Sequence, residues 1–362
     1  MRTYQIALIP GDGVGKEVAP FGVESVQAAA DLVGGFAVRW EAFPWGCDYY
    51  LEHGAMMPRD GLDLLRPFDA ILFGAAGFPS VPDTISLRGL RLAICQGFDQ
   101  YANVRPSIML PGVRGPLRDK NLADVNFVVV RENSEGEYSG AGGRLHLGMP
   151  HETAVQTTVF TRAGVERIVR FAYELAQRRP RKGLASVSKS NAQEHVFGLW
   201  DEVFAELGRE YRDVKTERLL VDAMAYRFVL HPESLDVVVA SNLFADILTD
   251  LGAAICGSLG LAPSANLNPE REYPSMFEPI HGSAPDIYGQ GIANPIAMVW
   301  SGAMMLEHLG ETEAAALIVD AIRATTAEGR VRTPDLGGGS TTAEVGSAIV
   351  GHMRALAQGA DR

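Results

Sequence analysis

Short apolar runs alternate with amphipathic segments along most of this chain, and this alternation constrains the fold more than any other feature. Residues 4–9 read as a buried strand, residues 10–15 as a turn and residues 16–33 as an amphipathic helix. The pattern predicts further strands at 38–43, 69–74, 126–131, 185–188 and 235–240, and helices at 57–65, 162–177, 192–207 and 243–256. Short strands separated by helices predict an α/β fold with a largely parallel sheet covered on both faces.

The length of 362 residues predicts two domains. We expect boundaries near residues 100 and 255, which give a discontinuous domain of residues 1–100 plus 255–362 and a second domain of residues 101–254. The second domain contains a polar, Gly-rich passage followed by alternating β-branched residues. We therefore expect a projecting arm at about 133–161.

Charge and cysteine usage exclude several classes of function. The formal net charge of −12 gives no general attraction to nucleic acid or anionic lipid, so an anionic substrate needs local arginines. Cys47, Cys95 and Cys256 form no CxxC or Cys/His pattern, which disfavours a disulfide framework or a zinc site and indicates a reducing cytoplasm. Gly and Pro interrupt the longest uncharged stretches, so we expect no membrane span.

The opening loop at residues 10–16 (PGDGVGK) joins a strand to a helix N-terminus, a place where backbone N–H groups attract phosphate. A dinucleotide fingerprint needs Gly where Lys16 stands. A P-loop needs Gly at Pro10 and Ser or Thr at Glu17. The loop is therefore either a plain tight turn or a segment next to a nucleotide.

Asp246 and Asp250 are four residues apart in a predicted helix, so their carboxylates project from one face. Asp222 precedes an expected strand end. Residues 243–256 contain no Lys or Arg, and three such acids suit Mg²⁺ or Mn²⁺. The alternative is a pair of solvated acids on an exposed helix face.

Four further side chains are candidates for substrate chemistry. Arg105 and Arg131 each end an apolar strand-like stretch, where a guanidinium can hold a carboxylate in a bidentate fork or simply reach solvent. Tyr138 and Lys189 form a candidate acid/base pair, or are ordinary surface residues.

A Pro- and Gly-rich loop surrounds His281, which therefore does not look like a core histidine. Asn294 and Pro295 follow this loop. They predict an N-cap and a first helical residue.

Together these segments resemble the β-decarboxylating dehydrogenases, the family of isopropylmalate, isocitrate, D-malate and tartrate dehydrogenases. The resemblance covers at least residues 5–339 and is carried by IPGDGVGKE, FDQYANVRP, VVVRENSEGEYSG, VSKSN, VDAMA, ASNLFADILTDLGAAICGSLGLAPSAN, EPIHGSAPDIYGQGIANP and TPDLGG. It implies an isopropylmalate dehydrogenase-like fold with two α/β domains, a large mixed sheet and a projecting β arm. By the same resemblance, residues 1–100 plus 255–362 bind the cofactor. Residues 101–254 provide dimerisation and the substrate and metal site of a homodimer with shared active sites.

The resemblance also implies roles for individual residues. Asp246 and Asp250 bind Mn²⁺ or Mg²⁺, and Asp222 completes the site from the partner subunit. Arg105 and Arg131 hold substrate carboxylates, Tyr138 protonates the enol carbon, and Lys189 of the partner acts as base. The cofactor-binding residues are His281, Gly282, Ser283, Ala284, Asp286, Ile287 and Asn294.

The implied reaction is NAD-dependent oxidation of a small 2-hydroxy acid, with loss of a β-carboxylate where one is present. Cys95 stands where many family members have a third arginine, and residues 85–92 (ISLRGLRL) place charge where isopropylmalate enzymes have an apolar wall. This favours the branch that oxidises tartrate and decarboxylates D-malate. The alternatives are a 3-isopropylmalate or dedicated D-malate dehydrogenase and, outside catalysis, a regulatory subunit. Asp286 and Ile287 favour NAD over NADP, and the need for a monovalent cation is open.

Overall fold

The computed structural model describes residues 1–360, which divide into two compact units. Unit 1 comprises Met1–Gln100, Ile108–Leu122 and the chain from Ala253 on, and unit 2 comprises Tyr101–Ser107 and Ala123–Gly252. Ile108–Leu122 was expected in the second domain but clusters with unit 1. A reason is visible at Gly112, whose carbonyl accepts a hydrogen bond from Arg332 Nη2 at 3.2 Å and whose backbone lies against the Thr326 carbonyl.

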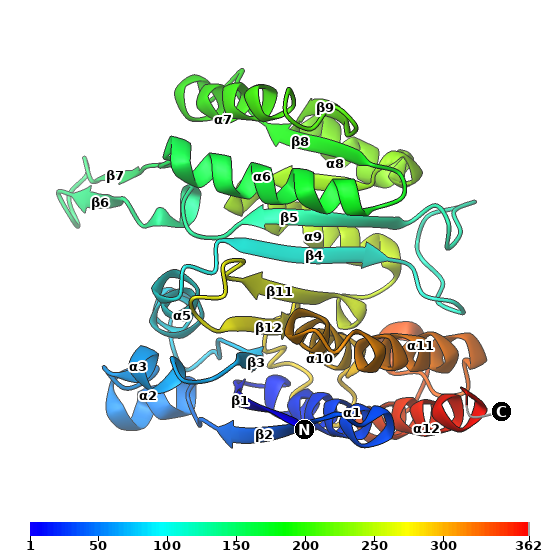
Figure 1. Cartoon of the computed structure of the whole chain (residues 1–362). Coiled ribbons are helices and arrows are strands. Elements are labelled where there is room, and N and C mark those ends of the chain that lie inside the picture. Colours follow the sequence, from blue (N-terminus) through cyan, green and yellow to red (C-terminus); the bar gives the residue numbers. More distant parts are fainter. Residues whose placement is uncertain (361–362) are drawn as a thin grey trace. The chain divides into compact units, whose positions relative to one another are not determined.

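Unit 1 contains five strands in the order β2–β1–β3–β12–β11, parallel except for the antiparallel pair β11–β12 (Figure 1). The strands are β1 (Arg2–Gly11), β2 (Phe36–Ala42), β3 (Ala70–Ala75), β11 (Pro263–Leu267) and β12 (Ser275–Pro279). The helices are α1 (Gly15–Val33), α2 (Cys47–His53), α3 (Gly61–Leu65), α4 (Asp83–Ser86), the π-helical turn η1 (Leu87–Arg91), α5 (Leu92–Gly97), η4 (Leu259–Leu261), α10 (Ile296–Leu309), α11 (Thr312–Glu328), η5 (Pro334–Leu336) and α12 (Thr342–Ala360). The predicted strand–turn–helix opening is confirmed.

Helix starts differ from prediction by one or two residues at α1 and at two helices of unit 2, and two further starts in unit 1 differ in ways that matter for its structure. The helix expected at 57–65 is confined to Gly61–Leu65. The helix after Pro295 begins at Ile296, whose N–H donates to Asn294 Oδ1 at 3.0 Å. Asn294 therefore satisfies a free backbone donor as predicted, although Pro295 is not itself helical.

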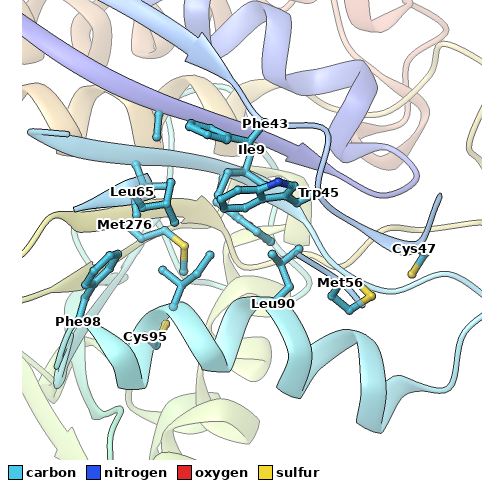
Figure 2. Packing of buried hydrophobic residues seen from close by; sticks show 14 of the residues in the cluster. Ile9, Phe43, Trp45, Cys47, Met56, Leu65, Leu90, Cys95, Phe98 and Met276 are labelled. Atoms are coloured by element: carbon cyan, nitrogen blue, oxygen red, sulfur yellow. The ribbon is translucent and has the colours of Figure 1, made fainter. Parts of the chain in front are cut away.

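A buried apolar cluster lies next to α5 in unit 1 (Figure 2). Phe98 and Cys95 from the α5 region and Met276 from β12 are fully buried in it, together with Leu90. Truncating a buried side chain such as Phe98 to Ala lowers the free energy of unfolding by about 3–5 kcal/mol. Cys95 is therefore a core residue.

Unit 2 has the strand order β4–β5–β10–β8–β9. The pairs β5–β10, β10–β8 and β8–β9 are parallel, as predicted for this part of the chain. Its strands are β4 (Ala102–Ile108), β5 (Asn126–Glu132), β8 (Gly183–Ser188), β9 (Lys215–Leu220) and β10 (Val237–Ala240). Its helices are η2 (Glu137–Ser139), α6 (Arg162–Arg178), α7 (Glu194–Leu207), α8 (Val221–Leu230), η3 (Pro232–Ser234) and α9 (Asn242–Cys256), whose residues up to Gly252 belong to this unit.

The expected arm is a separate antiparallel hairpin of β6 (Gly142–Leu145) and β7 (Thr153–Gln156), which extends from unit 2 (Figure 1). All eight strand residues are exposed, and the turn carries the exposed apolar side chains of Leu147 and Met149. A two-stranded ribbon with exposed apolar residues is marginally stable alone, so the hairpin is suited to contact another surface.

No helix within residues 1–360 is both long and apolar enough to cross a membrane. The three cysteines are unbridged and buried. Burial raises the pKa of the Cys47 and Cys256 thiols to about 12, so neither resembles an activated nucleophile.

Candidate active site

The candidate residues of unit 2 gather because four parallel strands end along one edge. Arg131 lies near the end of β5, Lys189 follows β8, Asp222 follows β9, and the helix carrying Asp246 follows β10. The carboxyl ends of parallel strands share one edge of a sheet and commonly support a ligand site.

Two buried arginines contact the carboxylate of Asp246. Arg131 Nη1 donates to Asp246 Oδ1, and Arg105 Nη1 lies 3.4 Å from the same oxygen. The side chains of Arg105 and Arg131 are only 5% and 3% exposed, so neither is a surface residue reaching solvent. Arg105 differs from prediction in position, since it lies in the middle of β4 instead of at its end.

Asp246 and Asp250 lie one turn apart on α9, which confirms the predicted helix and spacing. Burial and the neighbouring Asp246 charge raise the pKa of the Asp250 carboxyl, while Arg105 and Arg131 oppose the rise. Tyr138 Oη donates to Asp246 Oδ2 at 3.3 Å, and the Arg131 guanidinium lies over the Tyr138 ring, 5.5 Å from its centroid. Two arginines, a phenol and two carboxylates thus form one group, which we call the arginine–aspartate cluster.

Sequence reasoning missed four supporting side chains, of which two bond the arginines of this cluster and two lie in the segment that leads to Tyr138. Asn242 Oδ1 accepts hydrogen bonds from Arg131 Nε at 3.0 Å and Nη2 at 2.5 Å, and Thr249 Oγ1 accepts one from Arg105 Nη1 at 2.7 Å. Two sequence signals were available. Asn242 is a polar residue just after a buried strand, and Thr249 is a polar residue on the apolar side of a helix.

The other two missed residues are glutamates around the Tyr138 turn. Glu137 accepts hydrogen bonds from Ser241 Oγ at 2.9 Å and from the Leu243 N–H at 3.2 Å, which ties the turn to the start of α9. Glu132 is fully buried and accepts the Ser134 N–H at 2.8 Å. Burial raises the pKa of the Glu132 carboxyl.

Lys189 and Asp222 form a second group. Asp222 lies in the first turn of α8 and does not precede a strand end, so that expectation was wrong. Lys189 Nζ donates to Asp222 Oδ1, and this hydrogen bond lowers the pKa of the Asp222 carboxyl. Because β5, β10, β8 and β9 are adjacent in that order, Asp222 follows a strand three positions from the strand of Arg131.

The structure does not bring the three predicted metal ligands together in one chain. Residues 1–360 contain no group of three or more His, Cys, Asp or Glu side chains able to hold a metal ion. Asp246 and Asp250 nevertheless offer hard oxygen ligands on one helix face. Burial, and then the Asp246 charge, raise the pKa of Asp250, and a cation bound beside it would favour the ionised carboxylate. One chain therefore brings together two of the three predicted ligands of a divalent-ion site, and we call Asp246 and Asp250 the half-site.

The predicted cofactor residues lie in unit 1, after β12. His281, Gly282, Ser283, Ala284, Asp286 and Ile287 belong to one loop, and Asn294 lies just before α10. Asp286 is exposed, and burial lowers the pKa of the half-buried His281 ring. Asn294 differs from the others because its amide is engaged internally, donating to Asp335 Oδ2 at 3.0 Å and accepting from Ile296.

Of the two arginines expected to provide charge at residues 85–92, one is buried inside unit 1. Arg91 Nη2 forms a buried ion pair with Glu278 at 2.6 Å and a hydrogen bond with Asn266 Oδ1 at 3.3 Å. Arg88 is exposed. The expectation that both arginines offer charge to a substrate is therefore unsupported for Arg91.

Residues 5–349 match the family model described as isocitrate/isopropylmalate dehydrogenase. The chain is 57% identical over 349 residues to a protein of Agrobacterium vitis named "Probable tartrate dehydrogenase/decarboxylase", covering 96% of this chain and 97% of that one. It is 52% identical to the D-malate dehydrogenase [decarboxylating] of Escherichia coli (strain K12), covering 96% and 98%. The crystal structure of isocitrate dehydrogenase from Methylococcus capsulatus superimposes with a TM-score of 0.88 at 38% identity, covering 97% of this chain and 99% of that one.

Proposed function

Because this chain belongs to the isocitrate/isopropylmalate dehydrogenase family, we propose that it oxidises tartrate and oxidatively decarboxylates D-malate, using NAD and Mn²⁺ or Mg²⁺. The observation that carries the proposal is the arginine–aspartate cluster. Two buried arginines that face acidic oxygens suit a small dicarboxylate, and the adjoining carboxylates suit a hard cation.

Each side chain has a role that its position allows. Arg105 and Arg131 bind and orient the carboxylates of the substrate. When bound, the divalent ion supplies electrostatic stabilisation of negative charge on the substrate hydroxyl oxygen. Bound NAD would supply the hydride acceptor. Lys189 takes the hydroxyl proton of the substrate, and Tyr138 returns a proton to carbon after carbon dioxide is lost.

We propose a homodimer in which each active site takes Lys189 and Asp222 from the partner. Asp222 and Tyr226 lie one turn apart on α8, and the Tyr226 side chain is 63% exposed. Val229 is exposed on the same helix, and Ile247, next to Asp246 on α9, is 61% exposed. A second copy covering these apolar residues would bury them and carry Asp222 to the half-site made by Asp246 and Asp250.

We call residues 280–295, between β12 and α10, the cofactor loop. NAD is the proposed cofactor because Asp286 is an exposed acid in this loop. A carboxylate accepts a hydrogen bond from a free ribose hydroxyl and repels a 2′-phosphate. Like charges at about 4 Å and an effective dielectric of ~20 repel by roughly 4 kcal/mol before screening. Even after screening, this repulsion is enough for NAD to bind more than tenfold more tightly than NADP. The unbridged, buried cysteines suit a reducing compartment, and we propose the cytoplasm.

The test is a substrate panel followed by NADH absorbance, with tartrate stereoisomers, D-malate and 3-isopropylmalate offered with NAD or NADP in the presence of Mn²⁺. We expect the highest specificity constants for tartrate or D-malate with NAD, and loss of turnover in EDTA. Preference for 3-isopropylmalate would assign the alternative dehydrogenase, and turnover of D-malate alone a dedicated D-malate enzyme. No turnover with any of them would favour a regulatory subunit.

A further inference from the structure

The opening loop, which matches neither nucleotide-binding fingerprint, and the first turn of α1 contact the cofactor loop of unit 1 at two places. The Val14 N–H donates to the Ser283 carbonyl at 2.8 Å. Glu17 Oε1, one turn further along, accepts the Gly289 N–H at 2.5 Å. These two bonds hold residues 283–289 at both ends.

Gly13 makes the first contact sterically possible. Its φ of +50° lies in the left-handed region, and a Cβ at this position would lie 2.1 Å from the Ser283 carbonyl oxygen. The backbone of one loop therefore packs directly on the backbone of the other. Any side chain at residue 13 would displace the cofactor loop.

The opening loop is itself anchored to other parts of unit 1. Asp12 is 2% exposed, and its two carboxylate oxygens accept the Cys47 N–H at 2.7 Å and the Gly77 N–H at 2.8 Å. The Asp12 N–H donates to the Ala75 carbonyl at 2.9 Å. Because the start of α2 and the residues at the end of β3 both fix Asp12, the positions of Val14 and Glu17 are set before any ligand binds.

The segment between the two bonds needs such support. Ala284, directly after Ser283, has a φ of +40°, which is costly for a residue with a Cβ. Asp286 is exposed within the same segment. Within the stretch, the Ile287 N–H donates to the Ala284 carbonyl at 3.2 Å and the Tyr288 ring contacts Phe78. The two end bonds act together with these contacts to fix the position of Asp286.

We propose that residues 12–17 act as a clamp that preorganises the cofactor loop, with Val14 and Glu17 as positioning residues for the adenosine part of NAD. The Gly-rich opening thus serves nucleotide binding indirectly, by holding the backbone that contacts the nucleotide. This inference rests on the proposed function insofar as residues 281–294 bind the cofactor.

Glu17→Ala tests the clamp, with Glu24→Ala as the matched control because Glu24 is an exposed glutamate on the same helix. We expect Glu17→Ala to increase amide hydrogen exchange across residues 284–291 in cofactor-free protein and to weaken NADH affinity roughly tenfold by fluorescence titration. The KM for D-malate should change by less than twofold. Glu17→Gln retains an acceptor oxygen and should restore exchange and affinity to within about twofold of the parent.

Unchanged exchange and unchanged NADH affinity in Glu17→Ala would overturn the clamp, as would equal defects in the Ala and Gln variants or in Glu24→Ala. Faster exchange in Glu17→Ala, in a protein whose unaltered form binds no NADH, would uphold the clamp and overturn the proposed cofactor function. Gly13→Ala gives a second approach. We expect it to weaken NADH binding more than Glu17→Ala, with a circular dichroism melt showing that the fold is retained, and unaltered affinity in this folded variant would also contradict the clamp.

Discussion

The ion pair between Arg91 and Glu278 gives a prediction that separates a core role from a substrate role. The two side chains are 11% and 6% exposed, and the Arg91 Nε–H donates to Glu278 at 2.8 Å. Asn266 Nδ2 donates to the same carboxylate at 2.7 Å. Arg91→Met keeps most of the apolar stem of the side chain but removes its charge.

Removing one partner from a buried pair costs about 3–5 kcal/mol, because the remaining charge is buried without compensation. The Asn266 amide continues to stabilise Glu278, so we expect a loss near the lower end, about 3 kcal/mol. Neutralising both groups in Arg91→Met/Glu278→Gln should recover most of this loss, since no charge then stays behind. Arg88→Met, at an exposed position in the same turn, should change stability by no more than about 0.5 kcal/mol.

The assay is urea unfolding followed by circular dichroism at one fixed protein concentration, because subunit association would otherwise enter the midpoint. Steady-state kinetics with D-malate are measured on the same samples. If Arg91→Met unfolded within about 0.5 kcal/mol of the parent while its KM for D-malate rose tenfold, Arg91 would serve the substrate and our account of it would be wrong.

Four further predictions concern the site and its surroundings. Asp250→Asn should weaken Mn²⁺ binding at least tenfold in isothermal titration, since it removes one of the three carboxylates proposed for the site; unchanged affinity would reject the site. Lys189→Met should abolish oxidation, whereas Tyr138→Phe should fail only after decarboxylation, and rapid-quench measurement of NADH and pyruvate separates the two; full D-malate turnover by Tyr138→Phe would remove its role as proton donor. Tyr226→Asp should give an inactive monomer near 39.0 kDa by light scattering, while an active dimer would place the interface elsewhere. Burial beside Arg271 lowers the pKa of His308 to about 4, so the unfolded chain binds a proton first as pH falls from 6.5 to 4; stability should fall by about 2–3 kcal/mol over that range, and His308→Gln should lose this dependence.

The strands and helices that pack on apolar neighbours were predictable from sequence, because burial imposes a regular spacing on their apolar residues. Residues 126–131 and the helix containing Asp246 and Asp250 are examples. Asp222 was misplaced because residues 215–220 form a strand of mostly exposed or half-buried residues with no clear alternation, so the following helix had no visible start.

The supporting residues of the site could not be found from the sequence, because their roles depend on distant partners. Asn242 is 111 positions from Arg131, and Glu278 is 187 positions from Arg91. A polar residue in an apolar run signals that it needs a partner, but not which one. In the same way, nothing local distinguishes Arg88, which is exposed, from Arg91, which is buried.

The charges of the arginine–aspartate cluster determine how the binding of the cation and the binding of the dicarboxylate depend on each other. Arg105, Arg131, Asp246 and Asp250 sum to zero formal charge, and so do Lys189 and Asp222. A divalent cation alone would leave two uncompensated positive charges, and a dicarboxylate alone two negative ones. Only the pair restores neutrality. We expect strong thermodynamic coupling, in which the cation tightens the dicarboxylate and the dicarboxylate tightens the cation by the same factor, so that the cation–dicarboxylate complex is the species the protein holds most tightly.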